Sequence, residues 1–266
     1  MTATLIETDT DSALGVVLVV HGLNNKPEVM DSLINVLVDN GFHCLRVSLY
    51  QDAPEGRSDP SEIARAWRAI LTNAYANAQD RYPDLPRFAL SYSLGALTTI
   101  SFLDTETAPT FDRMVLLAPP VALTRSASLV RALTPLGRFN IALPSAAPKA
   151  IRARRGTPLS EYAAMLGLVG KVDTLGHPEK LGQIPTAVYL DPDDELVGYA
   201  GVLDWIHRNG LEKWSPRGFK GRDPEGRTYS HLMVLEKSLG PVAWTELTEY
   251  IVAHFKADGE PNTDNR

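Results

Sequence analysis

The sequence has one cysteine, no excess of basic charge and no long apolar run. A single cysteine, Cys44, excludes an internal disulfide and a cysteine metal cluster, and its apolar neighbours predict a packed strand residue. The net charge of -6 argues against a nucleic-acid partner, which would require a basic surface. No run of about 18 apolar residues could cross a bilayer, and the N-terminal residues lack the basic start of a signal peptide. We therefore expect a cytoplasmic protein without a transmembrane segment.

The composition is that of a globular protein with a substantial core. Hydrophobic residues make up 44% of the 266 residues and charged residues 22%, which is typical of soluble globular chains. Short apolar runs alternate with segments of helical spacing, and this alternation predicts a doubly wound, mostly parallel α/β sheet. The runs expected to form strands are 15–20, 42–49, 87–90, 113–118, 186–190 and 213–219. The segments expected to form helices are 27–39, 60–80, 94–103, 199–207 and 241–255.

The segment 119–184 differs from the rest of the chain. Two prolines open it, no strand is predicted within it, and helical spacing occurs at 129–133 and 159–169. Its charge is +6, so the remainder of the chain carries -12. We expect a basic helical lid at 119–184, inserted into a core formed by 1–118 and 185–256, and a disordered polar tail at 257–266. The basic surface is either a solvated helical face or a site for an anionic substrate group or for peripheral contact with a lipid surface.

A strand, a tight turn and a helix are predicted around Ser93. The turn reads Ser91-Tyr-Ser93-Leu-Gly95, and its small residues let backbone approach backbone. Ser93 would lie at the apex, where the N-terminus of the following helix aims free N–H groups and its positive end at the hydroxyl. The pattern is close to G-x-S-x-G, with Ser91 in place of the first glycine. Taken alone, it leaves open an ordinary serine-rich turn.

Three loops carry residues suited to nucleophilic catalysis. In open α/β sheets, ligands bind outside the carboxyl ends of the strands. Ser93 follows one predicted strand, an acidic cluster from Asp191 to Asp194 follows the strand at 186–190, and His231 lies in a loop near the end of the chain. Serine, acid and histidine in this order is the order found in α/β-hydrolases.

From Gly15 to Phe255 the chain resembles the lidded serine esterases and lysophospholipase-like members of the α/β-hydrolase superfamily. Four motifs carry the resemblance: an oxyanion loop at His21-Gly22-Leu23, a nucleophile turn at Ser91 to Gly95, an acid turn at Asp191 to Val197 and a histidine loop at Ser230-His231. The resemblance implies Ser93 as nucleophile, His231 as base and Asp194 as the acid that orients the base. It also implies an oxyanion hole formed by the N–H groups of Leu23 and Leu94, with no metal or cofactor.

Other residues compete for two of these roles. For the acid, the family pattern G-x-x-D-x-x-V favours Asp194, with Asp193 as the alternative and Asp191 as a turn former. For the base, His21 is the rival, although the resemblance places it in the oxyanion loop. The remaining histidines and the polar loop after His21 are interpreted as structural or solvated, with substrate contact as the alternative for the loop: His43, His177, His207, His254, Asn24, Asn25 and Lys26.

The resemblance implies hydrolysis of carboxylic esters, with a small ester or lipid-like molecule as substrate. The predicted substrate-binding residues share one face of the helix expected at 159–169: Tyr162, Met165, Leu166 and Val169. Such a face either packs on the core or covers an acyl chain, and a pocket beneath it would favour medium or longer chains. A thioesterase or acyltransferase using the same three residues is one alternative. A catalytically silent, ligand-binding member of the fold is another.

Overall fold

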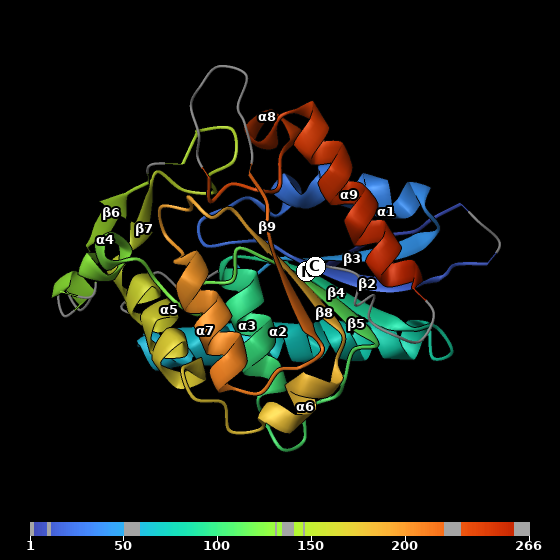
Figure 1. Ribbon diagram of the computed structural model, residues 1–266, viewed down its shortest axis with the longest axis horizontal. Helices are drawn as coiled ribbons and strands as arrows, with labels where there is room; N and C mark the ends of the chain where they lie inside the picture. Colours follow the sequence, from blue (N-terminus) through green and yellow to red (C-terminus); the bar gives the residue numbers. More distant parts are fainter. Residues whose placement is uncertain are drawn as a thin grey trace.

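The structure is a computed structural model that describes residues 3–9, 12–50, 59–130, 132–134, 141–145, 147–220 and 230–257. Its centre is a seven-stranded sheet (Figure 1). The strands lie in the order β1-β3-β2-β4-β5-β8-β9, with the bounds β1 Ala3–Ile6, β3 Phe42–Val47, β2 Gly15–Val20, β4 Arg87–Tyr92, β5 Arg113–Leu117, β8 Thr186–Leu190 and β9 Trp214–Gly218. The edge strand β1 is antiparallel to β3, and the other neighbours pair in parallel. The predicted α/β fold is confirmed.

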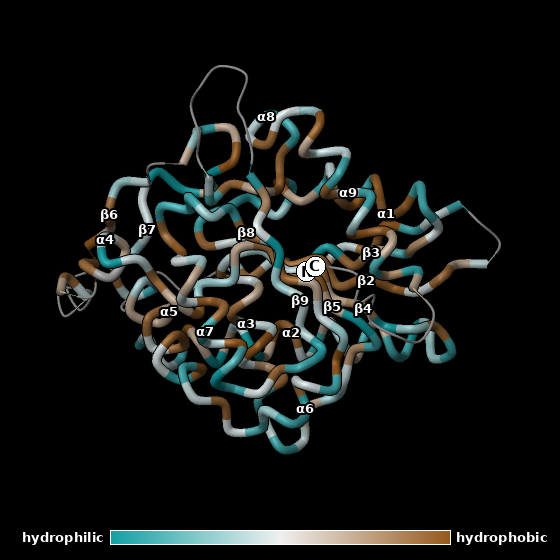
Figure 2. The backbone as a smooth tube through the Cα atoms, viewed as in Figure 1, coloured by the Kyte–Doolittle hydropathy of each residue, from teal (hydrophilic) through white to brown (hydrophobic). Residues whose placement is uncertain are grey.

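The middle of the sheet is buried on both faces. Val16 to Val20 of β2 have no exposed surface, and Met114 to Leu117 of β5 have none either. Continuous apolar runs suit such strands, because parallel sheets are covered by helices on both sides. Hydrophobic residues accordingly follow the central strands in Figure 2. The six strands predicted from the sequence are all present, to within a few residues at each end.

The pairing register brings the carboxyl ends of neighbouring strands to one edge. Val20 at the end of β2 pairs with Ser91 of β4, and Tyr92 at the end of β4 pairs with Leu117 of β5. Because all three strands run in the same direction, the loops that follow them leave the sheet side by side. The residues after β2 and β4 therefore meet at this edge.

Helices cover the two faces of the sheet (Figure 1). A short 3-10 turn (Pro27–Met30), α1 (Asp31–Asp39) and α9 (Pro241–Lys256) lie on one face, where α1 contacts α9. The other face carries α2 (Pro60–Arg81), α3 (Leu94–Leu103), α5 (Leu159–Val172) and α7 (Tyr199–Arg208). Asp59 caps α2, because its carboxylate accepts the Ser61 N–H at 2.7 Å. The short helices are α4 (Arg125–Ser128), α6 (Pro178–Gln183) and α8 (Glu236–Leu239).

The segment 119–184 departs from its prediction in one respect, and its longest helix takes one of the two placements left open. It contains an antiparallel strand pair, β6 (Ala142–Pro144) with β7 (Gly156–Pro158), although no strand was expected there. Strands of three residues are too short to show the alternation by which strands are recognised. Each of the two also ends in a proline, which is uncommon in strands. The helix α5 packs against α2 and α3, with Val169 and Val172 in the main core. Its burial is therefore that of a core helix.

Two further predictions fall partly or wholly outside the described residues. The helical patch expected at 129–133 follows α4 and is 3-10 helical at 129–130 and 132–134, with residue 131 outside the description. The predicted disordered tail lies outside it from residue 258 onward. None of the helices in the ranges given above is long and apolar enough to cross a membrane.

Candidate active site

Ser93 occupies the sharp turn between β4 and α3. Its backbone has φ 50° and ψ -117°, a conformation that residues other than glycine adopt rarely and that cannot continue either the strand or the helix. Gly95 makes the turn fit: a Cβ there would lie 2.6 Å from the Val20 carbonyl oxygen and 2.8 Å from that of His21. The first turn of α3 is therefore pressed against the end of β2, and the sharp turn predicted from the sequence is present.

Ser91 takes the place of a glycine without disturbing the turn. Its hydroxyl lies 2.9 Å from the Thr99 hydroxyl, and Thr99 in turn donates to the Gly95 carbonyl at 2.9 Å. Ser91 has no exposed surface, whereas Ser93 retains some. A buried hydroxyl paired inside the strand–helix junction cannot reach a substrate. The departure from G-x-S-x-G is thus accommodated by a hydrogen bond between β4 and α3.

A continuous chain of hydrogen bonds links Ser93, His231 and Asp194. The distance from Ser93 Oγ to His231 Nε2 is 2.8 Å, and the distance from His231 Nδ1 to Asp194 Oδ2 is also 2.8 Å. With Nδ1–H donating to the carboxylate, the Nε2 lone pair faces the serine hydroxyl. The Asp194 side chain is fully buried, and its second oxygen accepts the N–H groups of Leu196 and Val197 at 2.8 and 2.9 Å. The carboxylate is therefore held in place independently of the histidine.

The other two aspartates of the acid turn have different partners. Asp191 Oδ1 accepts the Asp193 N–H at 2.8 Å, which closes the turn. The Asp193 carboxylate is exposed and pairs with Lys220 at 2.8 Å. Asp194 is accordingly the carboxylate that the structure places at His231, while Asp191 has the turn-forming position expected for it.

The proposed oxyanion-hole residues follow the two strand ends that meet at the site. Leu94 is the first residue of α3, so its N–H belongs to the first turn, where helices leave donors without intrahelical partners. Leu23 follows β2 in a loop packed closely on Tyr92, because a Cβ on Gly22 would lie 2.9 Å from that ring. The lack of a side chain at Gly22 and Gly95 thus lets the loop after β2 and the first turn of α3 lie close together.

His21 stabilises this loop and is unsuited to act as a base. It has no exposed surface, its Nδ1 lies 2.7 Å from the Gly22 carbonyl oxygen, and its Nε2 accepts the Leu49 N–H at 3.0 Å. Both ring nitrogens are therefore engaged with the backbone. Burial lowers the pKa of His21 to about 4, so the ring is neutral at physiological pH.

The oxyanion loop is joined to the inserted segment by a set of hydrogen bonds that the sequence did not reveal. Asn24, which is buried and has φ 54°, accepts the Arg154 N–H at 3.0 Å and donates to the Arg154 carbonyl at 3.1 Å. The Asn24 carbonyl accepts the Ala153 N–H at 2.8 Å, and Lys26 N–H donates to the Ile151 carbonyl at 2.8 Å. No local pattern could have indicated contacts between segments about 130 residues apart.

Arg154 is more constrained than its place in a basic segment suggests. Its guanidinium pairs with Glu161 at 2.5 Å and lies 4.9 Å from the centre of the Tyr50 ring. Burial also raises the pKa of Tyr50 beyond its ordinary range. One of the basic residues of the insert therefore contributes to internal packing instead of to a freely solvated face.

The four predicted substrate-binding residues lie on α5, and their surroundings differ. Leu166 and Val169 are buried, and Val169 belongs to the main core. Tyr162 and Met165 are half-buried, and Met165 packs on the edge of that core. Core packing explains the burial of Val169 without any ligand, so a substrate role for these residues stays a prediction.

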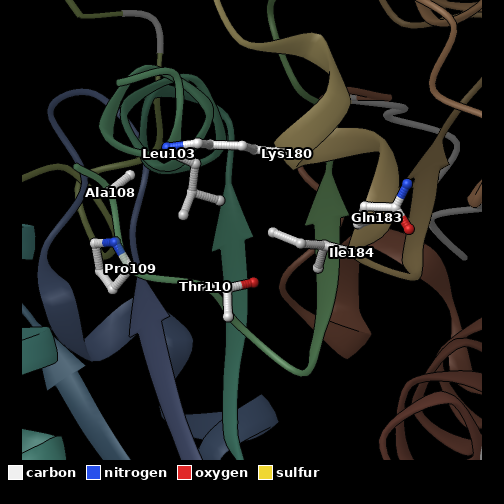
Figure 3. A pocket seen from close by; sticks show the side chains of 7 residues that line it. All are labelled: Leu103, Ala108, Pro109, Thr110, Lys180, Gln183 and Ile184. Carbon is white, nitrogen blue, oxygen red and sulfur yellow. The ribbon is translucent and has the colours of Figure 1, made fainter. Parts of the chain in front are cut away.

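A cavity of about 300 Å³ lies on the side of the sheet away from Ser93, near the amino ends of β5 and β8 (Figure 3). Its lining comes from the end of α3 and the loop after it, and from α6 and the residue that follows it: Leu103, Ala108, Pro109, Thr110, Lys180, Gln183 and Ile184. Thr110 precedes β5 and Ile184 precedes β8, so the cavity faces the amino ends of these strands. It is therefore separate from Ser93 and is not the predicted acyl pocket. Within the described ranges, no three His, Cys, Asp or Glu side chains are grouped to hold a metal ion.

Comparison with known proteins identifies the family. The family model described as "Serine aminopeptidase, S33" (Hydrolase_4) matches residues 11–166, more than half of the chain. The chain belongs to this family. It is an enzyme of the α/β-hydrolase superfamily, as the resemblance implied. No curated protein sequence matches it.

Solved structures with the same fold span nearly the whole chain. A soluble variant of monoglyceride lipase from Saccharomyces cerevisiae has 12% identity and a TM-score of 0.71, with 96% of this chain and 92% of that chain covered. A carboxyl esterase from Bacillus coagulans has 13% identity and a TM-score of 0.66, with coverages of 94% and 92%. A monoacylglycerol lipase from Paleococcus ferrophilus has 14% identity and a TM-score of 0.63, with coverages of 95% and 98%. At these identities the likeness establishes the fold.

Proposed function

We propose that this protein is a serine hydrolase that cleaves carboxylic esters through an acyl-enzyme intermediate. The observation that carries the proposal is the chain of two 2.8 Å hydrogen bonds from Ser93 through His231 to Asp194, located at the carboxyl ends of the strands. This is the geometry of a nucleophile, a base and an acid that orients the base. The lipases and esterases among the similar structures support an ester as the substrate.

The reaction follows from the arrangement of these groups. Ser93 Oγ attacks the carbonyl carbon while His231 Nε2 takes its proton, and Asp194 stabilises the resulting imidazolium. The carbonyl oxygen becomes an oxyanion that the N–H groups of Leu23 and Leu94 would stabilise; in another enzyme one such donor is worth about 2.7–4 kcal/mol. His231 then gives its proton to the leaving alkoxide, and Ser93 keeps the acyl group as an ester. A water molecule that His231 deprotonates releases the acid and restores the enzyme.

The inserted segment is the proposed source of substrate selectivity. Because α5 packs on the core helices, we assign the lid to the residues between Pro119 and α5, and we assign Tyr162 and Met165 to a pocket wall beneath it. The hydrogen bonds from Asn24 to Arg154 support this placement, since they tie the insert to the oxyanion loop. An apolar pocket at this place would favour medium or longer acyl chains and lipid-like esters.

A panel of substrates tests the reaction type. Purified enzyme is assayed with p-nitrophenyl esters from acetate to dodecanoate, the matching thioesters, and aminoacyl p-nitroanilides, since the family description names an aminopeptidase. Hydrolysis of esters, lost in Ser93→Ala, is the expected result. Preference for thioesters, or acyl transfer to an added alcohol in place of hydrolysis, would select the alternative reactions with the same residues. Turnover of the anilides alone would replace ester hydrolysis with peptide hydrolysis, and no turnover of any kind would indicate a ligand-binding protein.

The same panel tests the pocket. Met165→Ala removes a half-buried side chain from the proposed wall, and it is expected to alter the ratio of dodecanoate to acetate hydrolysis. Leu37→Ala, on α1 across the sheet, is the control for a loss of packing alone. A strict preference for acetate that neither variant changes would contradict the acyl pocket while leaving the ester chemistry intact.

A further inference from the structure

We propose that Tyr92 and Glu195 are positioning residues that hold the main chain of His231 in place for proton transfer. Tyr92 precedes Ser93 in the sequence, and Glu195 follows Asp194. The residues next to Ser93 and Asp194 in the sequence would thus hold the main chain of His231, while Ser93 and Asp194 themselves contact its ring. The inference rests on the proposed role of His231 as the base.

Four residues from distant parts of the chain contact His231 at four different atoms. Ser93 and Asp194 bind the two ring nitrogens. The Tyr92 hydroxyl donates to the His231 carbonyl oxygen at 3.0 Å, and the His231 N–H donates to Glu195 Oε2 at 3.2 Å. The dipeptide 92–93 therefore contacts one ring nitrogen and the carbonyl, and the dipeptide 194–195 contacts the other ring nitrogen and the N–H.

His231 needs such support because it stands in irregular backbone. Residues 230–235 form neither helix nor strand, and α8 begins only at Glu236. The Met233 N–H also donates to the His231 carbonyl, at 3.1 Å, which is a contact within the same short stretch. Within the described part of the chain, the side-chain anchors that relate the main chain of His231 to the sheet are those from Tyr92 and Glu195, 139 and 36 residues away along the chain.

Tyr92 is built as a rigid anchor. Its side chain is 3% exposed, its ring packs against Gly22, and its ring centre lies 5.4 Å from that of His231. Burial, with smaller contributions from the charges of Asp194 and Glu195, raises the pKa of Tyr92 well above its ordinary range. The hydroxyl therefore keeps its proton and donates it to the carbonyl over the working pH range. Because the ring also packs against Gly22 of the oxyanion loop, Tyr92 fixes the position of His231 relative to that loop.

Glu195 is the weaker anchor and connects the histidine to the insert. Its side chain is exposed, so water competes for its hydrogen bond with the His231 N–H. Its main-chain carbonyl accepts the Thr124 hydroxyl at 2.9 Å, at the start of the inserted segment. An acceptor oxygen is what the His231 N–H requires, and the amide of a glutamine supplies one as well.

Three variants test the proposal, with a matched control. A displacement of about 1 Å can lower turnover about 100-fold, so we expect Tyr92→Phe, which removes one of two anchors, to lower kcat about tenfold with little change in KM. Glu195→Ala is expected to lower kcat by a smaller factor, and Glu195→Gln to restore most of it. Tyr75→Phe is the control, because Tyr75 is also buried and donates to a main-chain carbonyl, that of Thr110 at 2.7 Å, far from Ser93 near the start of β5. Its hydroxyl also accepts the Arg87 Nε–H at 3.0 Å, so the control should lose at least as much stability as Tyr92→Phe and keep its kcat.

Proton NMR provides a readout that does not depend on turnover. The low-field resonance of the proton between His231 Nδ1 and Asp194 should broaden or shift in Tyr92→Phe and stay unchanged in Tyr75→Phe. An unchanged resonance together with an unchanged kcat in Tyr92→Phe would overturn the proposal for that residue. A Glu195→Gln variant as impaired as Glu195→Ala would show that charge, and not an acceptor, is what matters there. If wild-type protein hydrolysed no ester but the resonance still responded to Tyr92→Phe, the proposed function would fail while the positioning of His231 stood.

Discussion

The side chain of Asn24 forms two hydrogen bonds with the backbone of Arg154, one as acceptor at 3.0 Å and one as donor at 3.1 Å. The two residues are separated by 130 positions in the chain. Asn24 directly follows Leu23, a proposed donor to the oxyanion, and Arg154 lies in the inserted segment. The buried Asn24 amide therefore couples the position of the insert to that of the oxyanion loop, in addition to the two main-chain hydrogen bonds with Ala153 and Ile151.

Replacing Asn24 should impair catalysis more than stability alone explains. Asn24→Gly keeps a residue that tolerates the positive φ and removes both hydrogen bonds. We expect a loss of about 1–3 kcal/mol in unfolding free energy, from backbone groups left without partners, and a fall in kcat as the Leu23 N–H moves. Asn209→Ala is the control, because Asn209 also accepts one main-chain N–H and donates to one carbonyl, away from the site at the end of α7. Equal losses of kcat in both variants would refute a specific effect on the oxyanion loop.

The acid turn gives a sharp contrast among three aspartates. Asp194→Asn would present an amide to His231 Nδ1 and favour the wrong tautomer, a change that lowers kcat about 10⁴-fold in a serine protease. We expect a loss of similar size here. Asp193→Asn removes only an exposed ion pair with Lys220, and Asp191→Asn keeps an acceptor for the turn, so both should change kcat little. Steady-state kinetics on the three purified variants decides, and a larger loss in Asp193→Asn than in Asp194→Asn would move the acid role.

A fully buried histidine, His21, and a half-buried one, His254, predict a loss of stability in acid. Burial lowers the pKa of His254 to about 4, with a smaller effect from Arg113, and burial likewise lowers that of His21 to about 4. Below the unfolded value of about 6.5 the unfolded chain binds protons that the folded chain does not, so stability is fully present above this pH and falls until about pH 4.

The His254 contribution can be isolated by mutation. His254 Nε2 lies 3.3 Å from the Pro185 carbonyl oxygen, and the amide of Gln can donate to the same acceptor. Between pH 7 and pH 5, the wild-type unfolding free energy should fall by about 2 kcal/mol more than that of His254→Gln. Urea unfolding at the two pH values measures the difference, and identical pH dependence of the two proteins would contradict a neutral His254 in the folded state.

Most of the main sheet could be predicted because its central strands are buried on both faces, whereas the partly exposed edge strand β1 was not predicted. Runs such as 15–20 and 186–190 contain no charged residue and are buried along their whole length, so they are recognisable without any knowledge of their neighbours. The strand pair β6–β7 was missed because strands of three residues are too short to show an alternation of apolar and polar side chains. The helix at 159–169 was predicted correctly as a helix, but its packing on α2 and α3 depends on contacts that a single amphipathic pattern does not specify.

The same limit applies to the candidate site. Ser93, Asp194 and His231 lie at strand ends or in short motifs, so spacing and chain order brought them into one hypothesis. The structure places Ser93 and Asp194 within hydrogen-bonding distance of the two ring nitrogens of His231. Tyr92, Glu195 and Asn24 do their proposed work through partners 36 to 139 residues away. Such pairings are created by the fold, and nothing in the local sequence distinguishes these residues from ordinary turn or core positions.

The most direct test of the central claim is covalent labelling by a fluorophosphonate, located by mass spectrometry of the digested protein. The reagent reacts with a serine only when a base and an oxyanion hole activate it. We predict one adduct, on Ser93, with unchanged labelling in Ser91→Ala and a large loss of labelling rate in His231→Ala. An adduct on Ser91, labelling at an equal rate without His231, or no adduct on the folded wild-type protein would contradict the assignment of Ser93 as an activated nucleophile.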